Sequence, residues 1–216
     1  AESLGAGWGG GSLAGRATGA VGTIGAFSFN GNKIVTSGGG GMIVTDDPEL
    51  ARRARHLTTQ AKVPDVGYLH DEIGYNYRLT NLSAALGGAQ LARLDEFVGA
   101  KGRIAERYDS AFAATPLVLP PRIEGSDATY WLYSVLTADA AERDRLVSFL
   151  AERKIGARAL WRPLHQQPSF DGISEYLGGD NGDQLFQRGV SLPCSTQLSD
   201  DAQARVIDAV LEFYSV

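Results

Sequence analysis

A lysine in a turn between two apolar segments is the residue of this chain best suited to covalent chemistry. The run FSFNGNK ends at Lys33, and IVTSGGGG follows it. The chain has four lysines, and no acidic residue lies within eight positions of Lys33 on either side. An amine with no anionic partner is available to form an imine with a carbonyl compound. The alternative is a solvated turn lysine without a chemical role.

A possible anion site lies next to this lysine. Ser28 precedes Lys33 by five positions, and four glycines follow at residues 38–41. A hydroxyl group and bare backbone amides can surround a phosphate where larger side chains would block it. The run matches neither the dinucleotide-binding fingerprint nor the P-loop. Because glycine-rich turns are common, this pattern alone does not identify a ligand.

The remaining reactive side chains favour structural roles or leave the choice open. We expect His56 to be solvated on a charged helix face and Cys194 to be a small buried side chain. His70 precedes Asp71-Glu72, and His165 ends the run WRPLH. No second His or Cys stands at ligand spacing from either histidine, so we predict no metal site.

The composition is that of an ordinary globular protein and excludes several classes. The 216 residues are 44% hydrophobic and 21% charged, with a formal net charge of −5. This charge argues against a nucleic-acid-binding surface, which needs an excess of clustered Lys and Arg. The single cysteine excludes an internal disulfide and favours a reducing, cytoplasmic compartment. No apolar run is long enough to predict a membrane-spanning helix.

The glycine-rich N-terminal part must hold the lysine turn between short strands. We predict strands at 24–29 and 42–45, with the turn at 30–32 between them. A helix capped by Asp46 or Asp47 then runs to Thr58. Residues 59–80 form a long irregular connection, which is typical of a functional segment because its aromatic content argues against disorder.

The C-terminal half has the pattern of a small α/β unit. From Asn81 a helix is expected to about Leu94 and, after Gly99 and Gly102, on through Phe112. We place a domain boundary near residue 110, which gives domains of residues 1–110 and 111–216. The second domain is predicted to contain strands at 130–136 and 157–160 and helices at 140–154 and 200–214.

Two long ordered blocks carry a family resemblance. FSFNGNKIVTSGGGGMIVTDD is similar to the active-site block of the DegT/StrS-type sugar aminotransferases, a branch of the fold type I pyridoxal-phosphate enzymes. HDEIGYNYRLTNLSAALGGAQLARLDEFV resembles the next block, and LWRPLH and RGVSLPCSTQLSDD resemble the C-terminal signatures. The resemblance covers essentially the whole chain. It implies an α/β fold with a partial large domain followed by a small C-terminal α/β domain.

The resemblance implies roles for four residues toward pyridoxal 5′-phosphate. Lys33 matches the lysine that holds the cofactor as a Schiff base, and Ser28 matches the serine that binds its phosphate. Asn76, in GYNYR, matches an asparagine that reaches the phosphate of the neighbouring subunit, which implies a homodimer with shared active sites. Glu2 stands at a position that lines the cofactor ring. Related dehydratases carry His in place of this lysine, so Lys33 indicates amino transfer.

The implied reaction moves an amino group, from glutamate as the expected donor, to a nucleotide-linked 4-keto-6-deoxy sugar for surface glycans. The chain most resembles enzymes that aminate such a sugar, for example UDP-linked 4-keto-6-deoxy-N-acetylhexosamines, and perosamine-type enzymes acting on a GDP-sugar are close neighbours. The substrate-side candidates are Asn32, His70, Trp161 and His165. For both histidines a structural role is an equally open alternative.

One departure from the family pattern leaves two rival interpretations. The family's aspartate at the pyridine nitrogen belongs upstream of Ala1, together with the N-terminal part of the large domain. The chain is therefore expected to be the C-terminal part of an enzyme, with exposed apolar surface that makes it sticky or oligomeric. The alternative is a catalytically inert fragment that folds or associates without cofactor. A nucleotide-sugar-binding module without chemistry would leave Lys33 unexplained.

Overall fold

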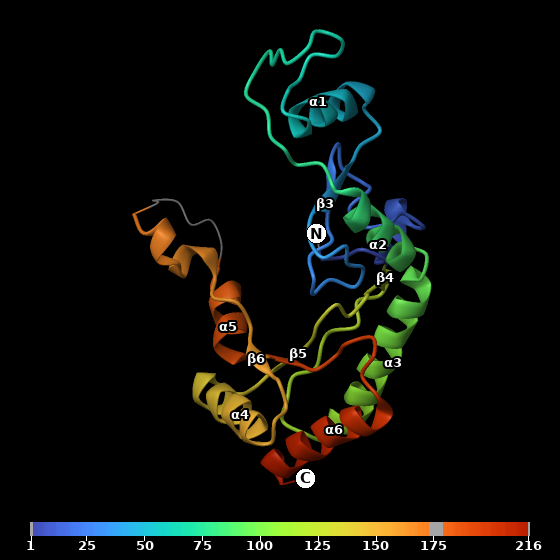
Figure 1. Ribbon diagram of the computed structural model, residues 1–216. Coiled ribbons are helices and arrows are strands. Elements are labelled where there is room, and N and C mark those ends of the chain that lie inside the picture. Colours follow the sequence, from blue (N-terminus) through green and yellow to red (C-terminus); the bar gives the residue numbers. More distant parts are fainter. Residues whose placement is uncertain (1, 173–178, 216) are drawn as a thin grey trace. The chain divides into compact units, whose positions relative to one another are not determined.

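The computed structural model describes residues 2–172 and 179–215 (Figure 1). These residues form two compact units. Unit 1 consists of Ala1–Gly99 and Ile123–Trp131, and unit 2 consists of Ala100–Arg122 and Leu132–Val216. The chain thus leaves unit 1 and returns to it for a short segment. The domain boundary that the sequence predicts near residue 110 stays a prediction.

Unit 1 contains two antiparallel strand pairs. β2 (Gly25–Ser28) pairs with β3 (Gly41–Val44), with Ser28 opposite Gly41, which confirms the two strands predicted around the lysine turn. β1 (Gly7–Trp8) pairs with β4 (Ser126–Asp127), and a short 3-10 helix, η1 (Gly11–Leu13), follows β1. The second pair was not predicted, because two-residue strands leave no alternating pattern in a sequence.

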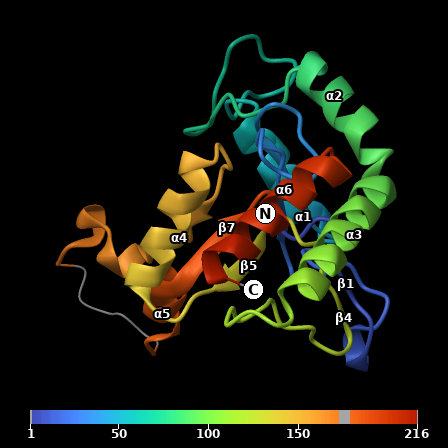
Figure 2. The same ribbon diagram turned by 90° about the horizontal axis from the view of Figure 1, so that it is seen from below.

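Three helices follow β3 along the chain. α1 (Pro48–Thr58) begins where the Asp47 carboxylate accepts hydrogen bonds from the N–H groups of Glu49 and Leu50, which confirms the predicted cap. α2 (Asn81–Leu91) has Ala92 as its C-cap, and α3 (Leu94–Phe112) begins two residues after this cap; Figure 2 shows them as separate coils.

The predicted interruption of α3 at Gly99 and Gly102 is wrong. The helix runs through both glycines because its buried side chains recur at helical spacing and outweigh the low helix propensity of glycine. These buried positions are Phe97, Lys101, Ile104, Ala105, Tyr108 and Phe112.

The connection between α1 and α2 is irregular, as predicted, but it is tied to α1. The N–H of Tyr75 donates to the Leu57 carbonyl at 2.7 Å, and the N–H of Gln60 donates to the Tyr75 carbonyl at 3.1 Å. Ala61 is fully buried at the start of the connection. The backbone of this segment is therefore fixed by hydrogen bonds, although it has no regular structure.

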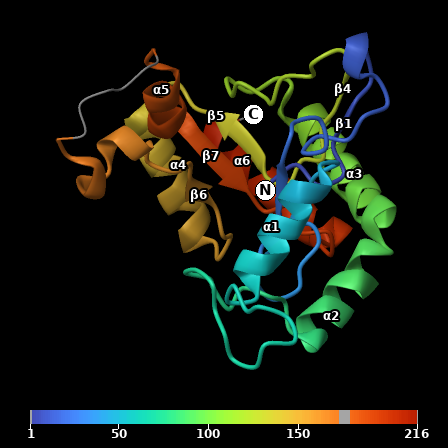
Figure 3. The same ribbon diagram turned by 90° about the horizontal axis from the view of Figure 1, so that it is seen from above.

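Unit 2 is built on a three-stranded antiparallel sheet with the order β5-β7-β6 (Figure 3). The sheet strands are β5 (Tyr133–Leu136), β6 (Arg158–Ala159) and β7 (Gly189–Leu192). The helices are α4 (Ala140–Glu152), α5 (Asn181–Arg188) and α6 (Asp200–Tyr214), with short 3-10 helices η2 (Leu164–Gln166) and η3 (Pro168–Phe170). α4 contacts α5, α6 and the sheet, as expected for a small α/β layer.

The sequence predicted α4 and α6 closely but missed α5 and β7. All four residues of β7 are buried, and such short apolar runs cannot be assigned from periodicity alone. β5 begins at Tyr133 and not at Tyr130, because Tyr130 adopts a left-handed backbone conformation with φ 47° and Trp131 belongs to unit 1. Among the described helices, none combines the length and the apolar character needed to cross a membrane.

Candidate active site

The turn that carries Lys33 is anchored on both sides by buried apolar residues. Phe29, Ile34 and Val35 form a core cluster with Phe97 of α3. The N–H of Lys33 donates to the Asn30 carbonyl at 3.0 Å, and the N–H of Phe29 donates to the Gly40 carbonyl at 2.9 Å. The apolar residues next to Lys33 therefore fix its backbone, while its side chain enters a pocket.

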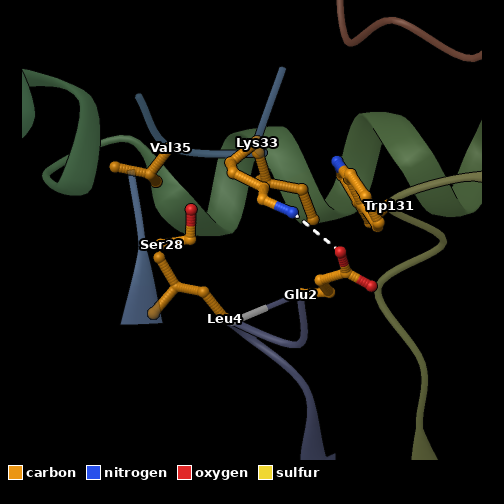
Figure 4. A pocket seen from close by; sticks show the side chains of 7 residues that line it. Glu2, Leu4, Ser28, Lys33, Val35 and Trp131 are labelled. Atoms are coloured by element: carbon orange, nitrogen blue, oxygen red, sulfur yellow. Dashed lines mark hydrogen bonds and ion pairs between the residues drawn. The ribbon is translucent and has the colours of Figure 1, made fainter. Parts of the chain in front are cut away.

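Lys33 points into a small pocket within unit 1 (Figure 4). Its ammonium donates a hydrogen bond to Glu2 Oε1 at 2.9 Å, and the Lys33 side chain is only 12% exposed. The prediction that Lys33 lacks an anionic partner is therefore wrong. Glu2 lies 31 residues upstream, so a search of the neighbouring positions could not find it. The pocket is lined by Glu2, Leu4, Ser28, Lys33, Ile34, Val35 and Trp131.

Ser28 lines the same pocket from the end of β2. Its hydroxyl oxygen accepts a hydrogen bond from the N–H of Asn30 at 3.4 Å. The opposite strand approaches closely here, since a Cβ atom on Gly41 would lie 2.3 Å from the Phe27 carbonyl oxygen. The structure thus brings an amine, a hydroxyl and a carboxylate, from Lys33, Ser28 and Glu2, into one pocket.

Trp131 completes the pocket and was not among the residues predicted from the sequence. Its indole N–H donates to the Asn32 carbonyl at 2.7 Å, and Lys33 Nζ lies 3.8 Å from the ring centroid. Trp131 is 99 residues from Asn32 and was placed in the interior of a predicted strand. No local pattern in the sequence marks this contact.

Three other predicted residues of unit 1 do not line the described pocket. The side chain of Asn32 is exposed, although its carbonyl accepts the Trp131 hydrogen bond. Asn76 is exposed in the connection after α1, where it forms an isolated bridge with Thr59. His70 is exposed as well, and its Nδ1 donates to the Gln60 carbonyl at 2.8 Å.

The two remaining substrate candidates lie in unit 2. Trp161 is 56% exposed, and the guanidinium carbon of Arg158 lies 5.2 Å from its ring centroid. His165 Nε2 is 2.8 Å from Asp183 Oδ1, a residue of the α5 helix that the sequence did not predict. The aspartate fixes the orientation of this imidazole.

The prediction that His56 is solvated is wrong. Its Nε2 lies 2.7 Å from Asp71 Oδ1 and 3.5 Å from Glu72 Oε1, and its side chain is 20% exposed. Arg53 pairs with Glu72 on the other side. These groups tie the long connection to α1. The sequence predicted no metal site, but ligand atoms of His56, Asp71 and Glu72 all lie within 4.8 Å of one another and could hold a metal ion.

Cys194 is buried, as predicted. Its Sγ accepts a hydrogen bond from the N–H of Tyr133 at 3.3 Å and lies 3.5 Å from Lys101 Nζ. It therefore belongs to the packing of unit 2.

The sequence was compared with known protein families, and it matches the DegT/DnrJ/EryC1/StrS aminotransferase family over residues 1–211. The chain belongs to this family. This family member is 41% identical to the putative pyridoxal phosphate-dependent aminotransferase EpsN of Bacillus subtilis over 204 residues, which are 93% of the chain and 53% of EpsN. It is 38% identical to the GDP-perosamine synthase of Escherichia coli O157:H7 over 203 residues, covering 93% of the chain and 54% of that enzyme.

Solved structures of the family share the fold. A DegT DnrJ EryC1 StrS aminotransferase from Brucella abortus superimposes with a TM-score of 0.88 at 30% identity, covering 100% of this chain and 56% of that one. DesV of S. venezuelae, solved in complex with a ketimine intermediate, gives a TM-score of 0.86 at 33% identity, covering 98% and 56%. The predicted family and the fold type I class are confirmed. The chain spans about half the length of the curated relatives it matches, as predicted for a partial large domain and a small domain.

Proposed function

We propose that this chain provides the lysine side of a pyridoxal-phosphate-dependent active site that transfers an amino group to a nucleotide-linked keto-sugar. The observation that carries the proposal is the Lys33 amine, which is largely buried in one pocket with the Ser28 hydroxyl. Relatives named as GDP-perosamine synthase and as dTDP-4-dehydro-2,3,6-trideoxy-D-glucose 4-aminotransferase support the substrate class.

The side chains of the pocket fit the chemistry of this cofactor. Pyridoxal phosphate presents an aldehyde and a phosphate. The pocket presents a primary amine from the turn after β2 and a hydroxyl from the end of β2. When bound, the cofactor supplies a carbonyl for covalent attachment and a ring that withdraws electrons from the reacting carbon. Lys33 would hold the aldehyde end, and the Ser28 hydroxyl would donate to the phosphate.

Lys33 Nζ has to change its state before it can react. In the ion pair with Glu2 the amine is protonated, whereas attack on a carbonyl requires its lone pair. The proton must therefore leave Nζ and the contact with Glu2 must open. The neutral Lys33 amine would then be able to accept a proton from the α-carbon of a bound amino donor, and the resulting ammonium would be able to donate it as a general acid.

The amino donor, the sugar acceptor and the oligomeric state are further parts of the proposed function. We expect glutamate as the donor and a 4-keto-6-deoxy sugar destined for surface glycans as the acceptor, in the cytoplasm. Asn76 is expected to serve the phosphate site of a neighbouring subunit in a homodimer, which agrees with its exposed position. Asn32, His70, Trp161 and His165 remain the predicted substrate-side residues.

The first experiment measures covalent attachment of the cofactor. The purified chain is mixed with pyridoxal phosphate, reduced with borohydride and digested, and the modified lysine is identified by mass spectrometry. Attachment at Lys33, its loss in Lys33→Ala, and its retention in Lys62→Ala are expected. Ser28→Ala should weaken cofactor binding about tenfold, since a hydrogen bond to a charged group is lost.

The rival interpretation, an inert fragment, predicts a different outcome. If the chain forms no adduct but a chimera with the N-terminal half of the Bacillus subtilis relative forms one at Lys33, the family chemistry stands and this chain alone is inert. If neither protein modifies Lys33, the aminotransferase proposal is overturned.

A further inference from the structure

Trp131 holds the reactive amine of the pocket from a direction that Glu2 does not cover. Lys33 Nζ lies 3.8 Å from the centroid of the indole ring and 2.9 Å from Glu2 Oε1. The ammonium thus meets the negative face of a π system and a carboxylate at the same time. Figure 4 shows the Lys33 side chain directed toward Glu2, with the Trp131 ring beside it.

The same indole also fixes the backbone next to the lysine. Its N–H donates to the carbonyl of Asn32, the residue immediately before Lys33, at 2.7 Å. A lysine side chain is a flexible four-carbon stem, so its amine has a defined position only if both the backbone and the ammonium group are restrained. Trp131 contacts both the backbone next to Lys33 and the Lys33 amine, whereas Glu2 contacts the amine only.

Trp131 can do this because it is itself rigidly held. It packs against the core cluster of Phe29, Ile34, Val35 and Phe97. Its segment is fixed by the pairing of β4 with β1 and by the N–H of Gly9, which donates to the Gly125 carbonyl at 2.9 Å. Glu2 lies just before β1 and Trp131 just after β4. The β1–β4 strand pair therefore positions both groups that contact the Lys33 amine, the Glu2 carboxylate and the Trp131 ring.

We propose that Trp131 is a positioning residue that seats the Lys33 amine for attachment to the cofactor, through its ring face and through the Asn32 carbonyl. The proposal rests on the function proposed above for Lys33. It assigns the segment Ile123–Trp131 to the site, although the predicted boundary near residue 110 would place it in the other domain.

The first test measures the accessibility of the amine without cofactor. Native protein is treated briefly with an amine-acylating reagent, and labelling of Lys33 is compared with that of Lys62 in the same sample by mass spectrometry. Trp131→Leu should raise the relative labelling of Lys33 about threefold or more, because ring and hydrogen bond are both lost. Trp131→Phe keeps an aromatic face and should give an intermediate value.

Phe170→Leu is the control, since Phe170 is a partly exposed aromatic residue of unit 2 and lies outside the pocket. It should leave the labelling of Lys33 unchanged. Circular dichroism and thermal unfolding establish whether each variant is folded. If Trp131→Leu is unfolded, Trp131→Phe alone decides the question. Labelling of Lys33 that is unchanged in every folded Trp131 variant overturns the positioning role.

The second test separates this proposal from the function itself. The rate of borohydride-trapped attachment of pyridoxal phosphate is measured for the same variants. A slower rate in Trp131→Leu with partial recovery in Trp131→Phe supports the positioning role. Equal attachment in all variants overturns it and leaves the proposed function intact. Altered labelling without any attachment, in the chain or in the chimera, supports the contact and overturns the function.

Discussion

In the pocket, the Lys33 amine contacts both the Glu2 carboxylate and the Trp131 ring. Glu2 is 56% exposed, and ion pairs of this kind are worth little in free energy because water screens them. A weak pair fits the proposed function, in which Lys33 must be released before it reacts. The buried apolar neighbours Ile34 and Val35 hold the backbone while the side chain changes partner.

Replacing Glu2 by Gln should speed attachment of the cofactor to Lys33. The amide keeps the size of the side chain but removes the charge that holds the ammonium. We expect a rise of roughly two- to fivefold in the rate of adduct formation near neutral pH, which corresponds to the loss of one exposed ion pair. Glu49→Gln in α1 is the control, because Glu49 pairs with Arg52 on the surface. A slower rate in Glu2→Gln would mean that the carboxylate assists the reaction.

Local spacing predicted that Lys33 and Ser28 lie near each other, because both belong to one strand-and-turn segment, and both line the described pocket. Their roles toward a cofactor stay predictions. The resemblance to the family added Glu2, which the structure places against Lys33. Trp131 could not be predicted, since its contact with the turn joins residues 99 positions apart. The anionic partner of Lys33 was missed by local spacing as well, because Glu2 lies 31 residues upstream.

At the scale of elements, a tyrosine of β5 ties the sheet of unit 2 to α3. The hydroxyl of Tyr133 donates to Asp109 Oδ1 at 2.7 Å, and Arg122 pairs with the other oxygen of this carboxylate. Burial, and then the hydrogen bond to Asp109, raise the pKa of Tyr133 above its ordinary value. The folded state thus favours the neutral phenol.

The hydrogen bond between Tyr133 and Asp109 should stop stabilising unit 2 at alkaline pH. A pKa that is higher in the folded state contributes stability that is complete below the unfolded value of about 10 and is lost as the pH rises above it. Tyr133→Phe should lower the free energy of unfolding by about 1 kcal/mol at neutral pH and should flatten its decline above about pH 10. Urea unfolding at several pH values measures both effects. Tyr77→Phe is the control, since Tyr77 is 73% exposed; an unchanged alkaline slope in Tyr133→Phe would contradict the assignment.

Elements with their own local signals were predictable, and elements defined by pairing were not. α1 and α6 have side-chain caps, Asp47 and Ser199, and long stretches of helical spacing. β1, β4 and β7 are short and owe their existence to partners far along the chain. The sequence therefore predicts the helices better than the sheet order.

At the scale of the whole molecule, unit 1 exposes apolar side chains on both faces of the β2–β3 hairpin. Met42 is 47% and Ile43 51% exposed, and adjacent strand residues point to opposite faces. Ile24, just before β2, is 53% exposed. Phe27, which pairs with Met42, packs against the core cluster, so the hairpin is covered only in part. Exposed apolar residues on both faces of a strand pair are unusual for an α/β fold, in which helices normally cover the sheet.

We therefore expect the isolated chain to associate through this hairpin at micromolar concentration. The double substitution Met42→Lys with Ile43→Lys places one positive charge on each face of the hairpin. It should shift the molar mass, measured by light scattering during gel filtration, toward that of the monomer. Leu185→Lys is the matched control, because Leu185 of α5 is also 47% exposed but stands in unit 2. A wild-type chain that elutes as a sharp monomer peak would contradict the expected association. If only Leu185→Lys released the monomer, association would occur through unit 2, and the hairpin would not be the surface that holds the copies together.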